Sequence, residues 1–463
     1  MATINEPIQL LQFVNDNLKP KEKEKKKNGE VFTPIILIDE MLDKLDENYR
    51  KQHNSSIFVD KSLKWYDPAV GIGNFPIIIY MRLLVGLADS IPDEEDRKRH
   101  IIENMLYMSE LNTNNTLVCK RVFFSDKYKL NLYEGDSLKL DITKEWGLEK
   151  FDIIIGNPPY NENGIGKGGG VFWKEFVKKS LSLLSQDGFL QFIHPTGWRK
   201  STGKRPSAGD IFEEFKKYNL LFIKISDIKI INFPRVDYYV LQNSNKKTKT
   251  RIINEYGGEK TDEELSIYEL PFIPHIINSI VISILNKLFN KNSGEKFNIV
   301  YNQSFPPKKE DMNKSGIPHT YYYDILEKDY LLAYKNYLDK NIPEYISNKK
   351  IIMTYKMGKE KAKLYPKYFS TEIGSTRNTM YQLIETNDNI NNILKLLDSE
   401  LINFVLKITQ YSEAPNYINE FKILNMISKP NKGTINNETD VYSYYGITEE
   451  EINFIQKIIQ KKL

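Results

Sequence analysis

The residues with the clearest chemical signature are Asn157-Pro158-Pro159-Tyr160, which directly follow the apolar run of residues 151–156. Such a run followed by two prolines predicts a buried strand that ends in a rigid turn. Because proline has no backbone N–H, the turn offers mainly carbonyl oxygens, together with the Asn157 amide and the Tyr160 ring. This set could accept hydrogens from an amino group on a flat base. The tetrapeptide alone is equally compatible with an ordinary proline turn after a strand.

Three segments before this turn could bind a ligand at the same edge of a sheet. The glycine loop, residues 67–73, reads Asp-Pro-Ala-Val-Gly-Ile-Gly, and its glycines let the backbone approach a ligand closely. Pro76 stands where a dinucleotide-binding loop has its third glycine, so a nicotinamide or flavin site is disfavoured. Glu110 follows a second apolar run and could accept from ribose hydroxyls, with a solvated glutamate as the alternative. Asp136 follows a third run and could accept from an adenine amino group.

The pattern between these segments predicts the elements that position them. From residue 65 to residue 241, short apolar runs alternate with helical periodicity, which predicts a mostly parallel sheet with helices on both faces. The polar residues 243–250 mark a hairpin or a domain boundary. Beyond them, tyrosines interleave with lysines, a pattern that suits either a nucleic-acid surface or half-buried sheet packing. Residues 276–289 predict an amphipathic helix, and Thr448 and Glu451 have the spacing of a capping box.

The composition restricts the class of protein. A chain of 463 residues with a formal net charge of +4 is long enough for two or three domains and permits nucleic-acid binding without requiring it. Cys119 is the only cysteine, so neither an intrachain disulfide nor a thiolate metal cluster can form. No apolar run reaches the ~18 residues that a membrane span needs, and a secretory pattern is absent. We therefore expect a cytoplasmic protein without a membrane span, or one in the host cytoplasm if the chain is viral.

Taken in order, these segments resemble the γ-class amino-group DNA methyltransferases, in particular the N6-adenine-specific branch with Asn-Pro-Pro-Tyr that occurs in type II restriction-modification. Residues 29–34, Gly-Glu-Val-Phe-Thr-Pro, look like that family's amino-terminal cofactor motif. Phe233, followed by a proline, looks like the phenylalanine that packs on an extruded base. Val70 and Ile72 replace the cysteine and serine that are usual in the family's glycine loop. The resemblance covers about residues 29–242.

The resemblance implies a Rossmann-like, mostly parallel, seven-stranded methyltransferase sheet with helices on both faces, followed by a carboxyl-terminal α+β domain. An amino-terminal helix and basic linker would occupy residues 1–28. The S-adenosylmethionine-dependent catalytic domain would span residues 29–245, and a DNA target-recognition domain with a closing helix would span residues 246–463.

The resemblance also implies N6-methylation of a flipped-out adenine in double-stranded DNA, with S-adenosylmethionine as methyl donor and no metal. The Asn157 side-chain oxygen and the Pro158 carbonyl would accept the two amino hydrogens, in a turn completed by Pro159 and Tyr160. Tyr160 and Phe233 would stack on the base. The implied cofactor-binding residues are Thr33, Asp67, Gly71, Gly73, Glu110 and Asp136. Thr33 would contact the methionine portion.

Other functions stay open at this point. RNA adenine methylation competes directly, and protein glutamine methyltransferases share Asn-Pro-Pro-Tyr because a side-chain amide poses the same chemical problem. The long chain after Gln242 and the motif at residues 29–34 favour DNA over glutamine, and the intact turn disfavours a non-catalytic DNA-binding modification subunit. The 28 residues before Gly29 are too few for a nuclease domain, so a cognate restriction endonuclease would be a separate chain. We expect a monomer.

Overall fold

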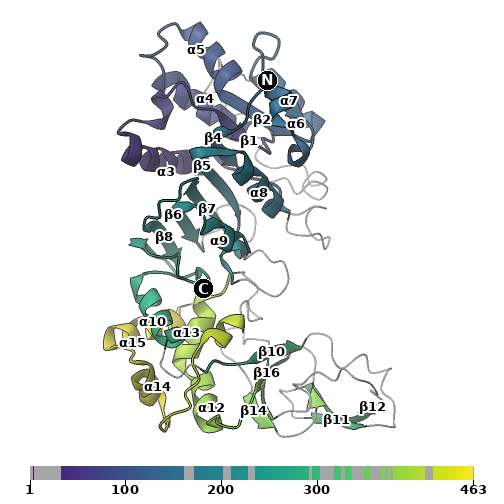
Figure 1. Ribbon diagram of the computed structural model, residues 1–463, viewed down its shortest axis with the longest axis vertical. Helices are drawn as coiled ribbons and strands as arrows, with labels where there is room; N and C mark the ends of the chain where they lie inside the picture. Colours follow the sequence, from purple (N-terminus) through teal and green to yellow (C-terminus); the bar gives the residue numbers. More distant parts are fainter. Residues whose placement is uncertain are drawn as a thin grey trace. The chain divides into compact units, whose positions relative to one another are not determined.

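The computed structural model divides the chain into two compact units, Met1–Phe272 and Ile273–Leu463 (Figure 1). The structure describes residues 4, 33–160, 172–201, 210–227, 235–290, 295–302, 317–324, 329–335, 349–354, 367–370, 374–375, 379–411 and 421–461.

A nine-stranded sheet is the frame of the first unit, with the strand order β3-β2-β1-β4-β5-β7-β6-β8-β9. Its strands are β1 (Trp65–Asp67), β2 (Leu106–Glu110), β3 (Asn131–Glu134), β4 (Phe151–Gly156), β5 (Leu184–Pro195), β6 (Asn219–Ser226), β7 (Val236–Gln242), β8 (Thr250–Tyr256) and β9 (Glu259–Leu265). Strands β3, β2, β1, β4 and β5 pair in parallel, as do β6 and β8, whereas β7 is antiparallel to both of its neighbours. The fold class is therefore α/β with a mostly parallel sheet, as predicted.

The sheet has nine strands and not the predicted seven, because β8 and β9 form a hairpin that continues it beyond β6. Gly257 and Gly258 make the two-residue turn, and both have the positive φ that such hairpin turns favour. Strand β9 is rich in charged residues, which protects this edge of the sheet from pairing with another chain. The hairpin also explains why the first unit extends to Phe272 and does not end near residue 245, where the domain boundary was predicted.

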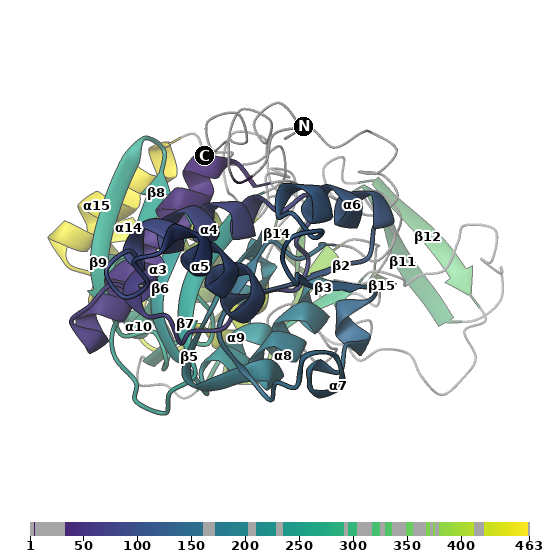
Figure 2. The ribbon, with the colours of Figure 1, turned by 90° about the horizontal axis from the view of Figure 1, so that it is seen from above.

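Helices cover both faces of this sheet (Figure 2). They are α3 (Ile35–His53), α4 (Asn74–Gly86), α5 (Glu94–His100), α6 (Thr113–Val122), α7 (Ile142–Trp146), α8 (Trp173–Leu183) and α9 (Asp210–Phe215), with the short turns η1 (Ile57–Val59), η2 (Ile101–Met105), η3 (Ser137–Lys139) and η4 (Thr196–Arg199). Helices α3 to α6 lie on one face and α7 to α9 on the other. This distribution follows from right-handed crossovers on either side of β1.

Helix α4 is the support of the glycine loop that precedes it. Ile77, Ile78 and Ile79 point in three directions around the helix, and all three are buried. A helix that is apolar on all sides must be enclosed, and α4 contacts α3, α5 and the strand β2. The first turn of α4 is therefore held firmly in place beside the sheet.

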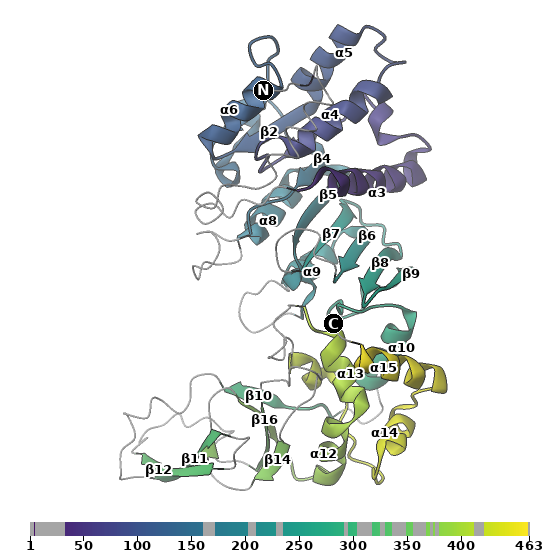
Figure 3. The same cartoon turned by 180° about the vertical axis from the view of Figure 1, so that it is seen from behind.

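The second unit combines two small sheets with a group of helices (Figure 3). Its elements are α10 (Ser279–Asn290), β10 (Ile299–Asn302), β11 (Ile317–Asp324), β12 (Asp329–Lys335), β13 (Lys350–Thr354), β14 (Lys367–Ser370), β15 (Gly374–Ser375), β16 (Thr379–Leu383), α12 (Ile390–Asp398), α13 (Glu400–Ile408), η6 (Phe421–Met426), α14 (Glu438–Tyr445) and α15 (Glu449–Gln460). The sheet orders are β10-β16-β13-β14 and β12-β11-β15. Helix α13 packs against α12, α14 and α15.

Two predictions about the second unit are confirmed. The amphipathic helix predicted over residues 276–289 is α10. Helix α15 begins with the predicted capping box, in which Thr448 Oγ1 accepts from Glu451 N (3.3 Å) and Glu451 Oε2 accepts from Thr448 N (2.8 Å). Within the described part of the chain, no helix is both long and apolar enough to cross a membrane.

Candidate active site

The glycine loop joins β1 to α4 in a tight turn. Its backbone is closed by a hydrogen bond from Gly73 N to Val70 O (3.0 Å) and is tied to β2 by one from Val70 N to Ser109 O (3.0 Å). Gly71 and Gly73 have φ values of 59° and 97°, a region that glycine enters without steric cost. The loop conformation thus depends on its two glycines, and Val70 in place of the family's usual cysteine leaves it intact.

The Glu110 carboxylate lies where the glycine loop meets the end of β2. Its Oε2 atom accepts from Gly71 N (2.7 Å), and its Oε1 atom accepts from Asn112 N (2.7 Å). One carboxylate therefore connects the glycine loop to the residue that caps α6. Because a carboxylate oxygen has two lone pairs, Glu110 can still accept from a ligand hydroxyl.

The Asp67 carboxyl group is buried beneath the glycine loop. Its Oδ1 atom accepts from Ala69 N (3.0 Å), and the last residue of β4, Gly156, packs directly on it. A Cβ atom at Gly156 would lie 2.6 Å from Asp67 Oδ1, so only glycine fits there. Burial, with a smaller contribution from Glu110, raises the pKa of Asp67 to about 8. The Asp67 carboxyl thus joins the end of β1 to the end of β4.

The turn after β4 contacts the residue that precedes Pro34 and α3. Asn157 Nδ2 donates to Thr33 Oγ1 (3.1 Å), and Asn74 Nδ2 donates to the Thr33 carbonyl (3.2 Å). Tyr160 is buried, and burial raises the pKa of its hydroxyl well above the ordinary value, while a hydrogen bond with the Asn157 side chain opposes the shift. The Tyr160 carbonyl accepts from Phe172 N (3.1 Å).

These elements surround a cavity of about 640 Å³ at the carboxyl ends of β1, β2 and β4. The predicted site residues that line it are Thr33, Gly71, Glu110, Asp136, Asn157, Pro158, Pro159 and Tyr160. Asp67 and Gly73 are not among its lining residues. Phe233 and residues 29–32 lie outside the described residues. The structure thus brings eight of the predicted residues to one cavity.

Asp136 lies at the start of η3, where it has a local structural role as well. Its Oδ1 atom accepts from Leu138 N (3.1 Å), which caps the turn, and its Oδ2 atom is 3.4 Å from Lys139 Nζ. The side chain is partly exposed and lines the cavity. It therefore remains available for contact with a ligand.

Two asparagines that sequence reasoning left without a role also line the cavity, Asn74 and Asn115. Both side chains are more than nine-tenths buried, and within the described residues Asn74 Oδ1 and Asn115 Nδ2 have no hydrogen-bond partner. Buried polar atoms are almost always paired, so these atoms point to a polar ligand. The only sequence signal was for Asn74, which directly follows the second glycine of the loop.

The cavity fits S-adenosylmethionine in size and in the chemistry of its walls. A volume of about 640 Å³ lies within the range of small-molecule sites. The Glu110 and Asp136 carboxylates are acceptors for hydroxyl and amino groups, and Asn74 and Asn115 add the two unsatisfied polar atoms. The glycine loop leaves room for close approach of the ligand.

A buried ion pair fixes the start of β7, the strand that follows Phe233. Arg199 Nε donates to Asp237 Oδ2 (2.6 Å), and Trp198 Nε1 donates to the same oxygen (3.0 Å). All three side chains are fully or almost fully buried. Burial raises the pKa of Asp237, and Arg199 opposes this shift. The ion pair therefore adds to the antiparallel pairing between the end of β5 and the start of β7.

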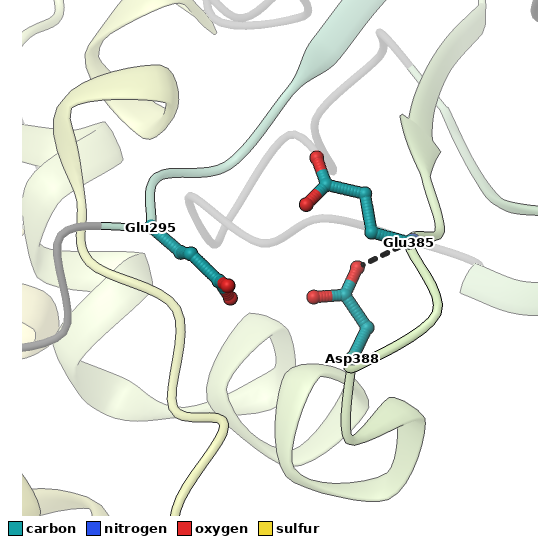
Figure 4. Close-up of side chains that lie close together, drawn as sticks. All are labelled: Glu295, Glu385 and Asp388. Carbon is teal, nitrogen blue, oxygen red and sulfur yellow. Dashed lines mark hydrogen bonds between the residues drawn. The ribbon is translucent and has the colours of Figure 1, made fainter.

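The second unit contains a group of three acidic side chains, Glu295, Glu385 and Asp388 (Figure 4). One of the three negative charges is offset by a buried lysine, and an asparagine amide donates to the group. The buried Lys429 Nζ lies 2.9 Å from Asp388 Oδ1 and 3.4 Å from Glu385 Oε2, and Asn431 Nδ2 donates to Glu295 and Asp388. The group is thus an internal ion-pair network whose cation is a lysine.

The chain is similar to several known proteins. A model of the Eco57I restriction-modification methylase family matches residues 78–228. An uncharacterised adenine-specific methylase of Mycoplasma pneumoniae is 25% identical across 56% of this chain and 78% of its own length. The modification methylase CviBIII of Paramecium bursaria Chlorella virus NC1A is 27% identical across 32% of this chain and 36% of its own length. The type IIL restriction-modification enzyme MmeI, solved in complex with DNA, has a TM-score of 0.53 at 12% identity, covering 100% of this chain and 78% of that one, which shows a shared fold. In sequence, this chain is therefore similar to the adenine-specific methylases of restriction-modification systems.

Proposed function

We propose that the protein transfers a methyl group from S-adenosylmethionine to N6 of adenine at specific sites in double-stranded DNA. The observation that carries the proposal is one cavity lined both by the turn from Asn157 to Tyr160 and by the carboxylates of Glu110 and Asp136. Amine acceptors and a fitting cofactor pocket in one space allow the two reactants to meet. The similarity to adenine-specific methylases in sequence supports the same reaction.

The cofactor would be held by the glycine loop and by the carboxylates of Glu110 and Asp136, which together form the loop side of the cavity. Gly71 and Gly73 would let the backbone approach it, and Glu110 and Asp136 would accept from its ribose hydroxyls and adenine amino group. Asp67 acts from below by fixing the loop through Ala69. When bound, S-adenosylmethionine supplies an electrophilic methyl group on a positively charged sulfur.

The turn after β4, residues 157–160, forms the turn side of the cavity and would orient the adenine amine for reaction. The N6 lone pair of adenine is delocalised into the ring, so the amine is a poor nucleophile. Two acceptors, Asn157 Oδ1 and the Pro158 carbonyl, would accept hydrogen bonds from the amino group and so direct its lone pair toward the methyl carbon. N6 forms the new bond with that lone pair, the electrons of the broken bond stay on sulfur, and N6 releases one proton to water. Good orientation of reactants contributes about 7–11 kcal/mol in such reactions.

A base inside a duplex cannot reach this cavity, so the adenine must flip out at a cost of a few kcal/mol. Stacking on Tyr160 and Phe233 would return about 1–3 kcal/mol for each ring. We assign methyl transfer to the first unit, which extends to Phe272, and target recognition to the second unit, which begins at Ile273.

The proposal is tested by transfer of labelled methyl groups from S-adenosylmethionine to unmethylated duplex DNA, followed by nucleoside analysis. RNA and a protein extract serve as parallel substrates. The expected result is N6-methyladenine in DNA alone. Label only in RNA or in protein would overturn the choice of substrate, and no label in any of the three would overturn the proposed methyl transfer.

A further inference from the structure

We propose that the Thr33 side chain is a positioning residue, which holds the Asn157 amide in the orientation that methyl transfer requires. The family resemblance implies only a contact between Thr33 and the cofactor. Because the new role presupposes methyl transfer at Asn157, it rests on the function proposed above. It differs from the implied role in a measurable way, because a positioning residue controls the rate of the chemical step and a cofactor contact controls binding.

The contact between the two side chains is direct and buried. Asn157 Nδ2 donates to Thr33 Oγ1 over 3.1 Å, and the two residues are 124 positions apart in the chain. Thr33 is 2% exposed, so water does not compete for the hydroxyl. A buried hydrogen bond of this kind contributes about 0.5–1.5 kcal/mol when made and costs more when one partner is left unpaired.

The orientation of the amide decides whether Asn157 can act on an amine. An asparagine amide can rotate by half a turn about its terminal bond at little intrinsic cost, which exchanges its oxygen with its NH₂ group. With the oxygen toward the adenine, the amide accepts an amino hydrogen. With the NH₂ group in that place, two donors would face each other and the amine would be repelled. In the structure Thr33 Oγ1 accepts from Nδ2, which corresponds to the first orientation.

Thr33 itself is held in place by its main chain, independently of its hydroxyl. Asn74 Nδ2, at the first residue of α4, donates to the Thr33 carbonyl over 3.2 Å. The next residue, Pro34, has a fixed φ and begins the first turn of α3, in which Leu37 N and Ile38 N donate to the Pro34 carbonyl. Replacement of the Thr33 side chain should therefore leave the backbone path unchanged. Through its carbonyl and its hydroxyl, Thr33 therefore connects the loop side of the cavity to the turn side.

The experiment compares Thr33→Val, which keeps the shape and removes the hydroxyl, with Thr33→Ser, which keeps the hydroxyl. Single-turnover methyl transfer to duplex DNA measures the chemical step, and calorimetry with S-adenosylmethionine measures cofactor binding without catalysis. Thr250→Val is the matched control, because Thr250 is also buried and its hydroxyl donates to the Leu220 carbonyl (2.6 Å), outside the cavity lining. Thermal melting of all variants reports folding.

We expect Thr33→Val to lower the single-turnover rate on the order of 10- to 100-fold, as small misplacements of reacting groups do, with the cofactor Kd unchanged. Thr33→Ser should restore most of the rate, and Thr250→Val should keep it. In an Asn157→Ala background, Thr33→Val should have no further effect on the rate, since the amide that it orients is gone.

Three results would overturn the inference. A weaker cofactor Kd with an unchanged rate in Thr33→Val would restore the simple contact role. An equal loss of rate in Thr250→Val would show that the effect comes from losing any buried hydroxyl. Effects of Thr33→Val and Asn157→Ala that multiply would show that these two side chains act separately. If wild-type protein methylates DNA adenine, any of these results leaves the proposed function standing. If wild-type protein transfers no methyl group, both proposals fall.

Discussion

The two sides of the cavity are built from different kinds of atoms. The glycine loop side relies on backbone geometry and on carboxylates that bond to backbone N–H groups, as Glu110 does with Gly71. The turn side relies on side-chain atoms, with the Asn157 amide beside the hydroxyls of Thr33 and Tyr160. The loop side therefore tolerates changes of side chain that keep the backbone path, whereas the turn side does not. Changes on the loop side should alter cofactor binding, and changes on the turn side should alter the rate or the capture of the adenine.

The two sides meet at Gly156, where we expect the largest effect. An added Cβ atom would lie 2.6 Å from Asp67 Oδ1. Gly156→Ala should cost about 1–3 kcal/mol of stability from overpacking and, by moving Asn157, about 100-fold in rate. Thermal melting and single-turnover assays measure both. Gly147→Ala is the control, because its Cβ would meet no atom within 4 Å. Its φ of 68° strains an alanine, so stability should fall while the rate is kept. If Gly156→Ala had the melting temperature and the rate of the wild-type protein, the close packing of the two sides would be contradicted.

Glu110→Gln isolates the loop side. Both Glu110 oxygens accept from backbone N–H groups, and a glutamine would set an NH₂ group against one of these donors. We expect the S-adenosylmethionine Kd to rise roughly 10- to 100-fold by calorimetry, with little change in the rate at saturation. Glu134→Gln is the control on the neighbouring strand, where the carboxylate bonds Thr116 and does not line the cavity. A reduced saturated rate with normal binding would assign Glu110 to the chemical step.

Tyr160→Ala isolates the contact of the turn side with the base. Loss of a stacking ring should weaken capture of the flipped adenine by about 1–3 kcal/mol, which appears in the KM for DNA. Tyr160→Phe keeps the ring and should keep most of this capture. If Tyr160→Phe lost as much as Tyr160→Ala, the hydroxyl would matter more than the ring.

The last effect concerns stability alone and the Asp67 carboxyl, whose pKa is raised by burial to about 8. The native state then holds a proton that the unfolded state loses near pH 4, so the Asp67 contribution to stability falls as pH rises from about 4 to about 8. Asp67→Asn removes this dependence. The melting temperature of Asp67→Asn minus that of wild type should increase between pH 5 and pH 8, because only the wild-type protein loses stability as Asp67 ionises. A difference that stays constant over that range would mean that Asp67 is ionised throughout.

Much of this architecture could be predicted from local patterns. The apolar run of β4 followed by two prolines placed a turn at a strand end, and the runs before Asp67 and Glu110 did the same for β1 and β2. The carboxyl ends of parallel strands share one edge of a sheet, so the residues after them meet.

The remaining features had no local signal. Strand β9 is an edge strand made almost entirely of charged residues, with no apolar run, and the sheet was predicted to be two strands too small. The contact between Thr33 and Asn157 joins residues 124 positions apart, and neither residue type indicates the other. Asn74 stood next to a recognisable loop, but only the fold brings its amide to the Thr33 carbonyl.

The most direct test of the central claim is the single-turnover rate of methyl transfer to duplex DNA in Asn157→Ala, measured together with cofactor binding. Without the amide oxygen, the amine loses an acceptor that matters in the transition state, so the rate should fall about 100-fold or more while the S-adenosylmethionine Kd stays at the wild-type value. Equal turnover in the Asn157→Ala and wild-type proteins would contradict the assignment of the turn after β4 as the site of methyl transfer.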